Sequence, residues 1–302
     1  MAIQPWLQIS YGADGSSYTK PYMIQTIRER KGLQLFGLML PGGFWLIAFF
    51  LLPLAMIAFI SVFRDGQFTL DGYQQSFEDV YITLFQRSIW ISFVTTVAAL
   101  LISYPVAVLM ARLPKEWRNP AVFLVMIPFW TNFLVRTYAL QFLMRNQGPI
   151  NSLLLSLGLI QEPLTMLNTY GAVLVGLIYG NLPFMILPLY SSLEKFDWTM
   201  IEAANDLGAN TARAFLRVML PLTAPGVLAG SILTFVPSIG TYVTAELMGG
   251  GQASMIGRAI AGKFEQGADW TFGSAMSLLL MVIVTAFALI YFRVGRGERV
   301  AL

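Results

Sequence analysis

Long stretches without charged residues alternate along the chain with short polar segments. About 20 apolar residues are needed to cross the hydrocarbon core of a bilayer, so each stretch of that length is a candidate membrane-spanning helix. None alternates as an outer-membrane barrel strand does, and helices satisfy their own backbone groups in lipid. The pattern predicts an all-α membrane protein with six transmembrane helices. The six stretches, the third interrupted only by Arg136, lie between Lys31 and Arg64, between Arg87 and Arg112, from Asn119 to Met144, between Glu162 and Glu194, between Arg217 and Glu246, and between Asp269 and Arg293.

The segments outside these stretches predict the remaining organisation. Residues 151–159 are apolar but too short to span, so we expect a short helix lying at the membrane surface. Residues 1–32 form a polar extension without the pattern of a cleavable signal peptide. We expect a transmembrane domain over residues 33–293, followed by a tail over residues 294–302.

Lys and Arg predict the orientation, because cytoplasmic loops carry an excess of both. Most of the 19 basic residues fall on one set of alternate connections when the N-terminus is placed inside. We therefore expect both termini in the cytoplasm. Residues 194–226 then form a cytoplasmic loop between the fourth and fifth predicted spans.

Every predicted span except the last contains proline. Proline removes a backbone donor and kinks a helix, and in lipid the freed groups need cover from neighbouring helices or water. Two interpretations remain open, simple curvature of the helices or a bundle that bends around a cavity. The prolines are Pro41, Pro53, Pro105, Pro128, Pro183, Pro188 and Pro237.

Composition supports the membrane class and excludes several chemistries. The chain is 56% hydrophobic and 12% charged, whereas a soluble domain carries about a quarter charged residues. It contains no His and no Cys, which removes thiolate metal sites, Cys nucleophiles and His-dependent triads. A net charge of +3 fits membrane-flanking loops better than nucleic-acid binding. No stretch matches the P-loop pattern, so energy must come from a partner or a gradient, and no metal or cofactor is expected in this chain.

The predicted cytoplasmic loop contains two short helical segments. For the first, over residues 200–207, Thr199 is the candidate N-cap and Glu202 lies three residues on, the spacing of a capping box. Gly208 is expected to end that helix.

The second segment runs over residues 211–219, and Leu220-Pro221 is expected to stop it. On the first segment Ala203 and Ala204 allow close approach by another protein. Glu202 and Asp206 share one face at the i, i+4 spacing. This loop is either a docking surface for another protein or an ordinary amphipathic linker.

A resemblance adds to this pattern. Glu202-Ala203-Ala204, Gly208, Val218 and Leu220-Pro221 are spaced as in the EAA loop of ABC importer permeases, where Ile usually stands in place of Val218. The resemblance implies that residues 200–207 are the coupling helix that seats in a groove of the ATP-hydrolysing subunit. It implies ATPase-coupling roles for Glu202, Ala203, Ala204, Asp206, Gly208, Leu220 and Pro221.

Further motifs over about residues 35–295 resemble the spermidine/putrescine importer permeases. The resemblance implies the type I (MetI-like) permease fold, polyamine transport, and partners that are an ATPase dimer, a second permease, an extracytoplasmic solute-binding protein and membrane lipid. ATP and Mg would be bound by the ATPase, and no nucleic acid is expected. Related branches carry opines, phosphonates or other small solutes, so the cargo stays open. The motifs lie at residues 128–138, 182–190, 246–250, 255–257 and 269–270.

Polar residues within spans are hypotheses for function. We favour for Arg136 a structural or gating ion pair, with a carboxylate or with a carbonyl freed near Pro128, over a substrate contact, because an Arg repels a cationic solute. Glu246, beside the aromatic ring of Tyr242, suits an ammonium ligand, although it can equally be a helix-end carboxylate.

Aromatic residues in and near the spans have two interpretations. Trp130, Tyr138, Tyr179 and Tyr242 can line a pore or belong to the aromatic belt at the membrane surface. A stand-alone secondary transporter would need a relay of ionisable groups within the spans, and none is evident. A membrane enzyme would need a catalytic constellation, which is also absent from the sequence. The sequence therefore favours a permease subunit that works by alternating access.

Overall fold

The computed structural model describes residues 40–64, 66–251, 253–265 and 269–297. The expected N-terminal extension and residues 298–302 of the expected tail lie outside these residues. The chain divides into two units, Met1–Phe59 and Ile60–Leu302.

The first unit contributes one apolar helix, Leu40–Ile60, which is long enough to cross a membrane and matches the first predicted span. It contains a π-helical turn, η1 (Ile47–Leu51), followed by α2 (Leu52–Ile60). Pro53 has no N–H to donate, and the helix widens directly before it, as helices do where a regular bond is lost.

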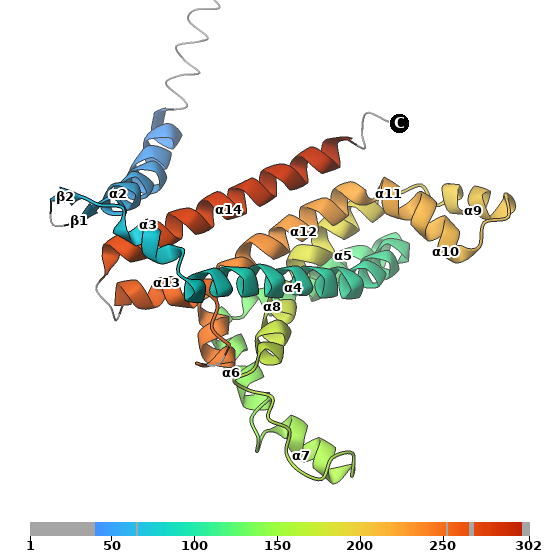
Figure 1. Ribbon diagram of the computed structural model, residues 1–302. Coiled ribbons are helices and arrows are strands. Elements are labelled where there is room, and N and C mark those ends of the chain that lie inside the picture. Colours follow the sequence, from blue (N-terminus) through green and yellow to red (C-terminus); the bar gives the residue numbers. More distant parts are fainter. Residues whose placement is uncertain (1–39, 65, 252, 266–268, 298–302) are drawn as a thin grey trace, which may run out of the picture. The chain divides into compact units, whose positions relative to one another are not determined.

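The second unit is helical apart from a small hairpin (Figure 1). The hairpin pairs β1 (Phe63–Arg64) with β2 (Gln67–Phe68). The helices before the loop over residues 194–226 are α3 (Asp71–Ser76), α4 (Asp79–Arg112), α5 (Lys115–Trp130), α6 (Phe133–Leu143), α7 (Pro149–Ser156) and α8 (Tyr170–Leu193). Those that follow are α9 (Thr199–Asp206), α10 (Thr211–Ala214), the π-helical η2 (Phe215–Met219), α11 (Leu220–Leu222), α12 (Ala224–Ile239), the π-helical η3 (Ala245–Gly249), α13 (Ile256–Glu265) and α14 (Trp270–Gly297).

The core of this unit lies where α4, α8 and α12 pack together. Without a hydrophobic force between helices in lipid, association depends on close packing of small residues. A Cβ added at Gly226 of α12 would lie 2.5 Å from the hydroxyl of Ser192 on α8. At Gly230 it would lie 2.8 Å from the sulfur of Met185. Glycine at both positions therefore lets the two backbones approach.

Two helices of the bundle are broken sharply. The third predicted span is not one helix, because α5 and α6 meet at 85°. The helix Ala224–Ile239 of the fifth predicted span meets the preceding segment Thr211–Leu222 at 71°. By contrast, α4 continues through Pro105, and α8 continues through Pro183 and Pro188. Proline alone therefore does not decide where the chain turns.

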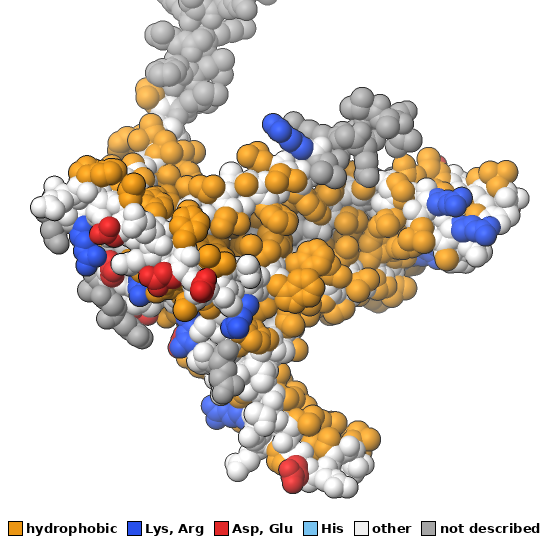
Figure 2. All heavy atoms as spheres, viewed as in Figure 1, with side chains coloured by type: hydrophobic (Ala, Val, Ile, Leu, Met, Phe, Trp, Pro, Cys, Tyr) orange, Lys and Arg blue, Asp and Glu red, His pale blue; other side chains and the backbone are white. Residues whose placement is uncertain are grey.

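Four described helices are long and apolar enough to span a membrane, and the number rises to six if each bent pair is one span. The prediction of six is consistent with this result. Figure 2 shows hydrophobic side chains over the middle of the second unit, with charged side chains near α3 and α13 at one end and near α10 at the other. This distribution fits a bundle whose middle faces lipid.

Candidate functional site

The loop over residues 194–226 folds into the expected two-helix unit, with corrected boundaries. Its first helix is α9, and Gly208 follows it with φ +85°. Only a left-handed backbone closes the helix in this way, with the Ala209 amide donating to the Ala204 carbonyl at 3.0 Å. Gly208 thus ends the helix as predicted.

The prediction that Thr199 caps α9 is wrong. Thr199 is the first helical residue, and the Asp197 carboxylate accepts from its amide at 3.0 Å and from its hydroxyl at 2.8 Å. These two bonds lower the pKa of Asp197, the hydroxyl bond contributing most. The capping carboxylate lies two residues earlier than the sequence pattern indicates.

The expected stop at Leu220-Pro221 is also wrong. The second helical segment continues through η2 and α11 to Leu222, because a proline at the start of α11 needs no N–H there. The turn comes at Thr223, which is fully buried. The Tyr104 hydroxyl of α4 lies 2.7 Å from the Thr223 hydroxyl. This contact joins the loop to α4 at the loop's bend.

Residues of the loop divide between an inner and an outer face of α9. Trp198 and Ile201 pack against the core cluster of α4 and α8. Met200 and Leu207 are exposed, Leu207 to 89%. Ala203, between them at helical spacing, is exposed too. The outward face is therefore a small apolar surface, which favours a docking surface over a linker.

The sequence analysis missed a second anchor for this loop. The Arg112 guanidinium at the end of α4 lies 4.5 Å over the Trp198 ring. The side chain of Arg118 on α5 lies 4.0 Å from the Glu194 carboxylate. The sequence does contain a signal for these contacts, namely the basic residues at the connection between α4 and α5. The sequence analysis used those residues only as evidence for orientation under the positive-inside rule.

A cavity of about 340 Å³ opens where α5 and α6 meet, beside α8 and the end of α12. Among its described lining residues only Arg136 is charged. Asn181, which the sequence analysis missed despite its place in mid-span, bonds the Leu177 carbonyl at 2.8 Å and the Ser238 hydroxyl at 3.3 Å. The lining comprises Phe129, Thr131, Phe133, Arg136, Gly176, Leu177, Gly180, Asn181, Phe184, Pro237, Thr241 and Thr244.

Arg136 takes one of the two partners predicted for it, a backbone carbonyl. Its guanidinium donates to the Pro128 carbonyl at 3.1 Å, and Thr131 donates to the same oxygen at 2.7 Å. That carbonyl belongs to the last turn of α5, where it has no partner within the helix. Among the described residues, no carboxylate pairs with Arg136.

Glu246 and Tyr242 are not paired with each other through their side chains. Glu246 forms an ion pair with Arg258, which also donates to the Gly250 carbonyl. The Tyr242 hydroxyl donates to Glu265 at 3.1 Å, and this bond raises the pKa of Tyr242. Neither residue lines the cavity at the α5–α6 break.

The three remaining aromatic candidates, Trp130, Tyr138 and Tyr179, also lie outside that cavity. Trp130 is 72% exposed and packs edge-on against Phe123, and Tyr138 is 53% exposed. Their exposure suits the aromatic belt as well as a pore.

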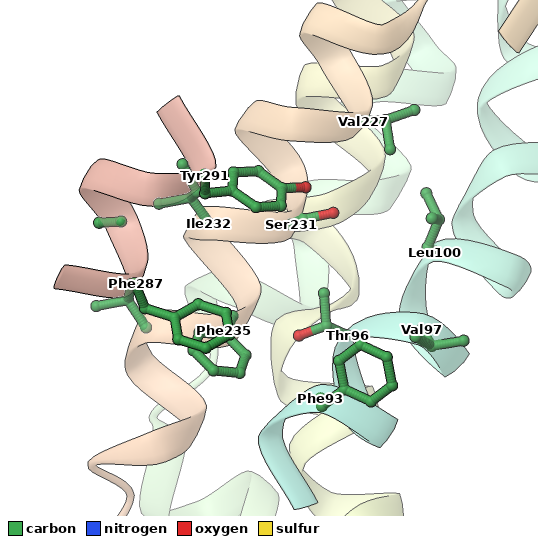
Figure 3. A pocket seen from close by; sticks show the side chains of 12 residues that line it. Phe93, Thr96, Val97, Leu100, Val227, Ser231, Ile232, Phe235, Phe287 and Tyr291 are labelled. Carbon is green, nitrogen blue, oxygen red and sulfur yellow. The ribbon is translucent and has the colours of Figure 1, made fainter. Parts of the chain in front are cut away.

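A second cavity, of about 250 Å³, lies between α4, α12 and α14 (Figure 3). Phe235 and Phe287 stack on one side of it, and the Tyr291 hydroxyl points toward Ser231. Most of its lining is apolar, so it offers few partners to a charged solute.

Residues 103–300 match the family model described as "Binding-protein-dependent transport system inner membrane component". The chain belongs to this family. The permease is 39% identical to "Spermidine/putrescine transport system permease protein PotB" of Haemophilus influenzae over 83% of its own length and 91% of that protein. The same identity, over 94% of the relative, holds for PotB of Escherichia coli.

Solved structures confirm the fold of the permease. A chain of a bacterial ABC transporter for alginate superposes with a TM-score of 0.66 at 17% identity, covering 91% of the permease and 99% of that chain. A chain of the methionine transporter MetNI superposes with a TM-score of 0.52 at 19% identity, covering 72% of the permease and 95% of that chain. The type I importer permease fold is therefore confirmed. As a permease component the chain is not catalytic, and ATP hydrolysis belongs to a separate subunit.

Proposed function

We propose that this permease imports polyamines, spermidine or putrescine, across the inner membrane, with both termini in the cytoplasm. Its assembly contains a second permease, two ATPase subunits that bind ATP and Mg, and an extracytoplasmic binding protein. The observation that supports polyamines as the cargo is the 39% identity to two PotB proteins over 83% of the chain.

The coupling role of α9 is supported by its geometry. The exposed face around Leu207 is free to seat in an ATPase groove, while Trp198 and Ile201 hold the inner face against the bundle. Glu202 and Asp206 are exposed on the same helix and can bind polar groups at the rim of that groove. Closure of the ATPase pair would then move α9 together with α4, because Tyr104 and Arg112 of α4 contact the loop.

Docking is tested with Leu207→Ala. Burial of a leucine contributes about 1.5–3 kcal/mol, so its truncation should weaken ATPase binding by about tenfold or more. Leu157→Ala is the matched control, because Leu157 is also exposed and also ends a short helix that is followed by glycine. Equal binding by the Leu207 variant and the wild type would refute the docking face.

The sidedness of the loop can be tested by thiol labelling. The chain contains no native Cys, so Thr211→Cys gives a single label site beside α9, and exposed Gln147→Cys marks the opposite end. An impermeant reagent applied to the outer face of the membrane should label only Gln147→Cys. Labelling of Thr211→Cys there would reject the orientation.

The cargo is tested by uptake of labelled spermidine into vesicles that hold the assembled transporter, with ATP inside and the binding protein outside. Uptake should stop without ATP. A second candidate, an anionic solute such as a phosphonate or an opine, is favoured by Arg136 on the cavity wall. Phosphonate uptake without spermidine uptake would replace the polyamine proposal.

Glu246 has two possible roles in this pathway, a contact with a substrate ammonium or an ion pair that holds the outer loop. Its carboxylate and Arg258 are both partly exposed, so their pairing contributes at most about 1 kcal/mol. If the pair is structural, the double variant Glu246→Gln/Arg258→Gln should transport as well as either single variant does. If Glu246 contacts the cargo, every variant that lacks the carboxylate should share one raised KM for uptake.

A further inference from the structure

The guanidinium of Arg136 lies in an environment that suits an alkylammonium ion. Its Nη1 atom lies 3.1 Å from the Pro128 carbonyl oxygen. Its Cζ atom lies 5.8 Å from the ring centre of Phe133 and 5.8 Å from that of Tyr179. A helix-end carbonyl with two aromatic faces attracts any compact organic cation, because the oxygen and the ring faces are both negative.

Arg136 is held there weakly. A guanidinium has five N–H donors, and among the described residues only the Pro128 carbonyl accepts from it. Phe133 is 42% exposed and Tyr179 is 37% exposed, so each cation–π contact is weak. Arg136 and Phe133 also line the cavity at the α5–α6 break.

We propose that Arg136 is a tethered cation that occupies an ammonium-binding subsite, formed by the Pro128 carbonyl and the Phe133 and Tyr179 rings, whenever the pathway is empty. This inference rests on the proposed polyamine cargo. A passing primary ammonium group displaces the guanidinium, and the guanidinium returns when the cargo leaves.

This arrangement explains why an arginine can line a route for cations. A subsite on a transport route must bind its cargo weakly enough to release it. A tethered competitor, present at an effective concentration of about millimolar, lowers the apparent affinity without removing the site. The positive side chain then acts as a competitor for the cargo and not as a fixed barrier.

The test is direct binding to the assembled transporter in nanodiscs without the binding protein. The probes are n-butylamine, spermidine and neutral n-butanol. Arg136→Gln removes the competitor, so n-butylamine and spermidine should bind about tenfold more tightly than to the wild type, and n-butanol should not. Arg136→Lys keeps a tethered cation and should bind as weakly as the wild type. Arg145→Gln removes an exposed arginine outside the cavity and is the matched control.

The ring contact separates this subsite from a general change of charge. In the Arg136→Gln background, Tyr179→Leu should abolish the gain, whereas Tyr179→Phe, which keeps the ring, should retain it. Arg136→Gln without any gain for the two amines would overturn the proposal, as would a gain that survives Tyr179→Leu. If Arg136→Gln does not assemble, the Tyr179 variants decide the question in the otherwise native chain. Spermidine uptake should then fall severalfold in Tyr179→Leu but not in Tyr179→Phe, and equal uptake by the two variants would overturn the proposal.

Failure of the subsite is distinguishable from failure of the cargo. If the wild type does not import spermidine but Arg136→Gln gains n-butylamine binding, the cargo proposal is wrong and the subsite stands. If the wild type imports spermidine and Arg136→Gln gains nothing, the cargo stands and the subsite is wrong.

Discussion

Replacement of Gly208 tests whether the end of α9, the proposed coupling helix, depends on the backbone conformation of this residue. Gly208 has φ +85°, and a Cβ added there meets nothing within 4 Å. Sterics with neighbouring residues are therefore absent, and the cost of Gly208→Ala is that of an L-residue in the left-handed region, about 1–2 kcal/mol. Since 1.4 kcal/mol is a factor of ten, the population of correctly closed α9 should fall about 5- to 30-fold relative to its unravelled form.

The assay is titration of the purified ATPase subunit against the permease in nanodiscs. Because Asn tolerates this conformation and β-branched Val does not, ATPase affinity should decrease in the order Gly, Asn, Ala, Val at position 208.

Gly158 provides a matched control for this series. It follows α7 with φ +67°, also has open space around a Cβ, and is flanked by the same hydrogen bond, here from Leu159 to Leu154. Gly158→Ala therefore has a similar backbone cost away from the coupling loop and should leave ATPase affinity unchanged. The reasoning is refuted if Gly208→Ala binds the ATPase as the wild type does, or if Gly158→Ala weakens it equally.

Three further predictions concern packing and capping. Gly226→Ala should lower stability in detergent by about 1–3 kcal/mol, because the new Cβ would lie 2.7 Å from a backbone oxygen of α8. Gly262→Ala is the control and should not lower it, because a Cβ at that position meets nothing within 4 Å. Tyr104→Phe removes one hydrogen-bond partner of the Thr223 hydroxyl. It should therefore lower the free energy of chemical unfolding by about 0.5–1.5 kcal/mol and speed amide exchange at Thr223. The carboxyl of Asp197 has a pKa below its ordinary 3.8, so its cap is intact at higher pH and is lost as the pH falls through that lowered pKa. ATPase affinity should not titrate through Asp197 between pH 7 and 4, and Asp197→Ala should weaken it throughout that range.

The sequence was sufficient for the spans and for the two-helix loop because both depend on local patterns. Hydrophobic length alone predicts a membrane helix, and it located α14 and the C-terminal ends of α4 and α8 within a few residues. Gly208 was predictable for a similar reason, because a helix that ends in a left-handed residue favours glycine whatever surrounds it.

Errors arose where two local signals compete. Thr199 and Asp197 can both cap α9, and the carboxylate two residues earlier accepts both available donors of Thr199. Pro221 looked like a stop, but proline is compatible with the first turn of a helix, and η2 carries the chain into α11.

Long-range partners could not be predicted at all. Glu246 and Arg258 meet because η3 and the start of α13 fold back on each other, and Tyr242 reaches Glu265 at the far end of α13. A helical pattern fixes neighbours three or four residues apart, whereas these pairs are 12 and 23 residues apart. The sequence analysis therefore did not find the side-chain partner of either Glu246 or Tyr242.

The break between α5 and α6 and the cavity beside it explain each other. A helix that ends inside a membrane leaves carbonyls without partners, which is tolerated only where protein or water covers them. Here Thr131 and Arg136 donate to the Pro128 carbonyl, and the Asn132 side chain accepts from the Leu134 amide at the start of α6. These polar side chains stabilise the break, and they also give the cavity its only described charge. Two of these groups, Thr131 and Arg136, also line the cavity. If the cavity is part of the proposed pathway, the shape of the third span and the chemistry that a solute meets there cannot be changed independently.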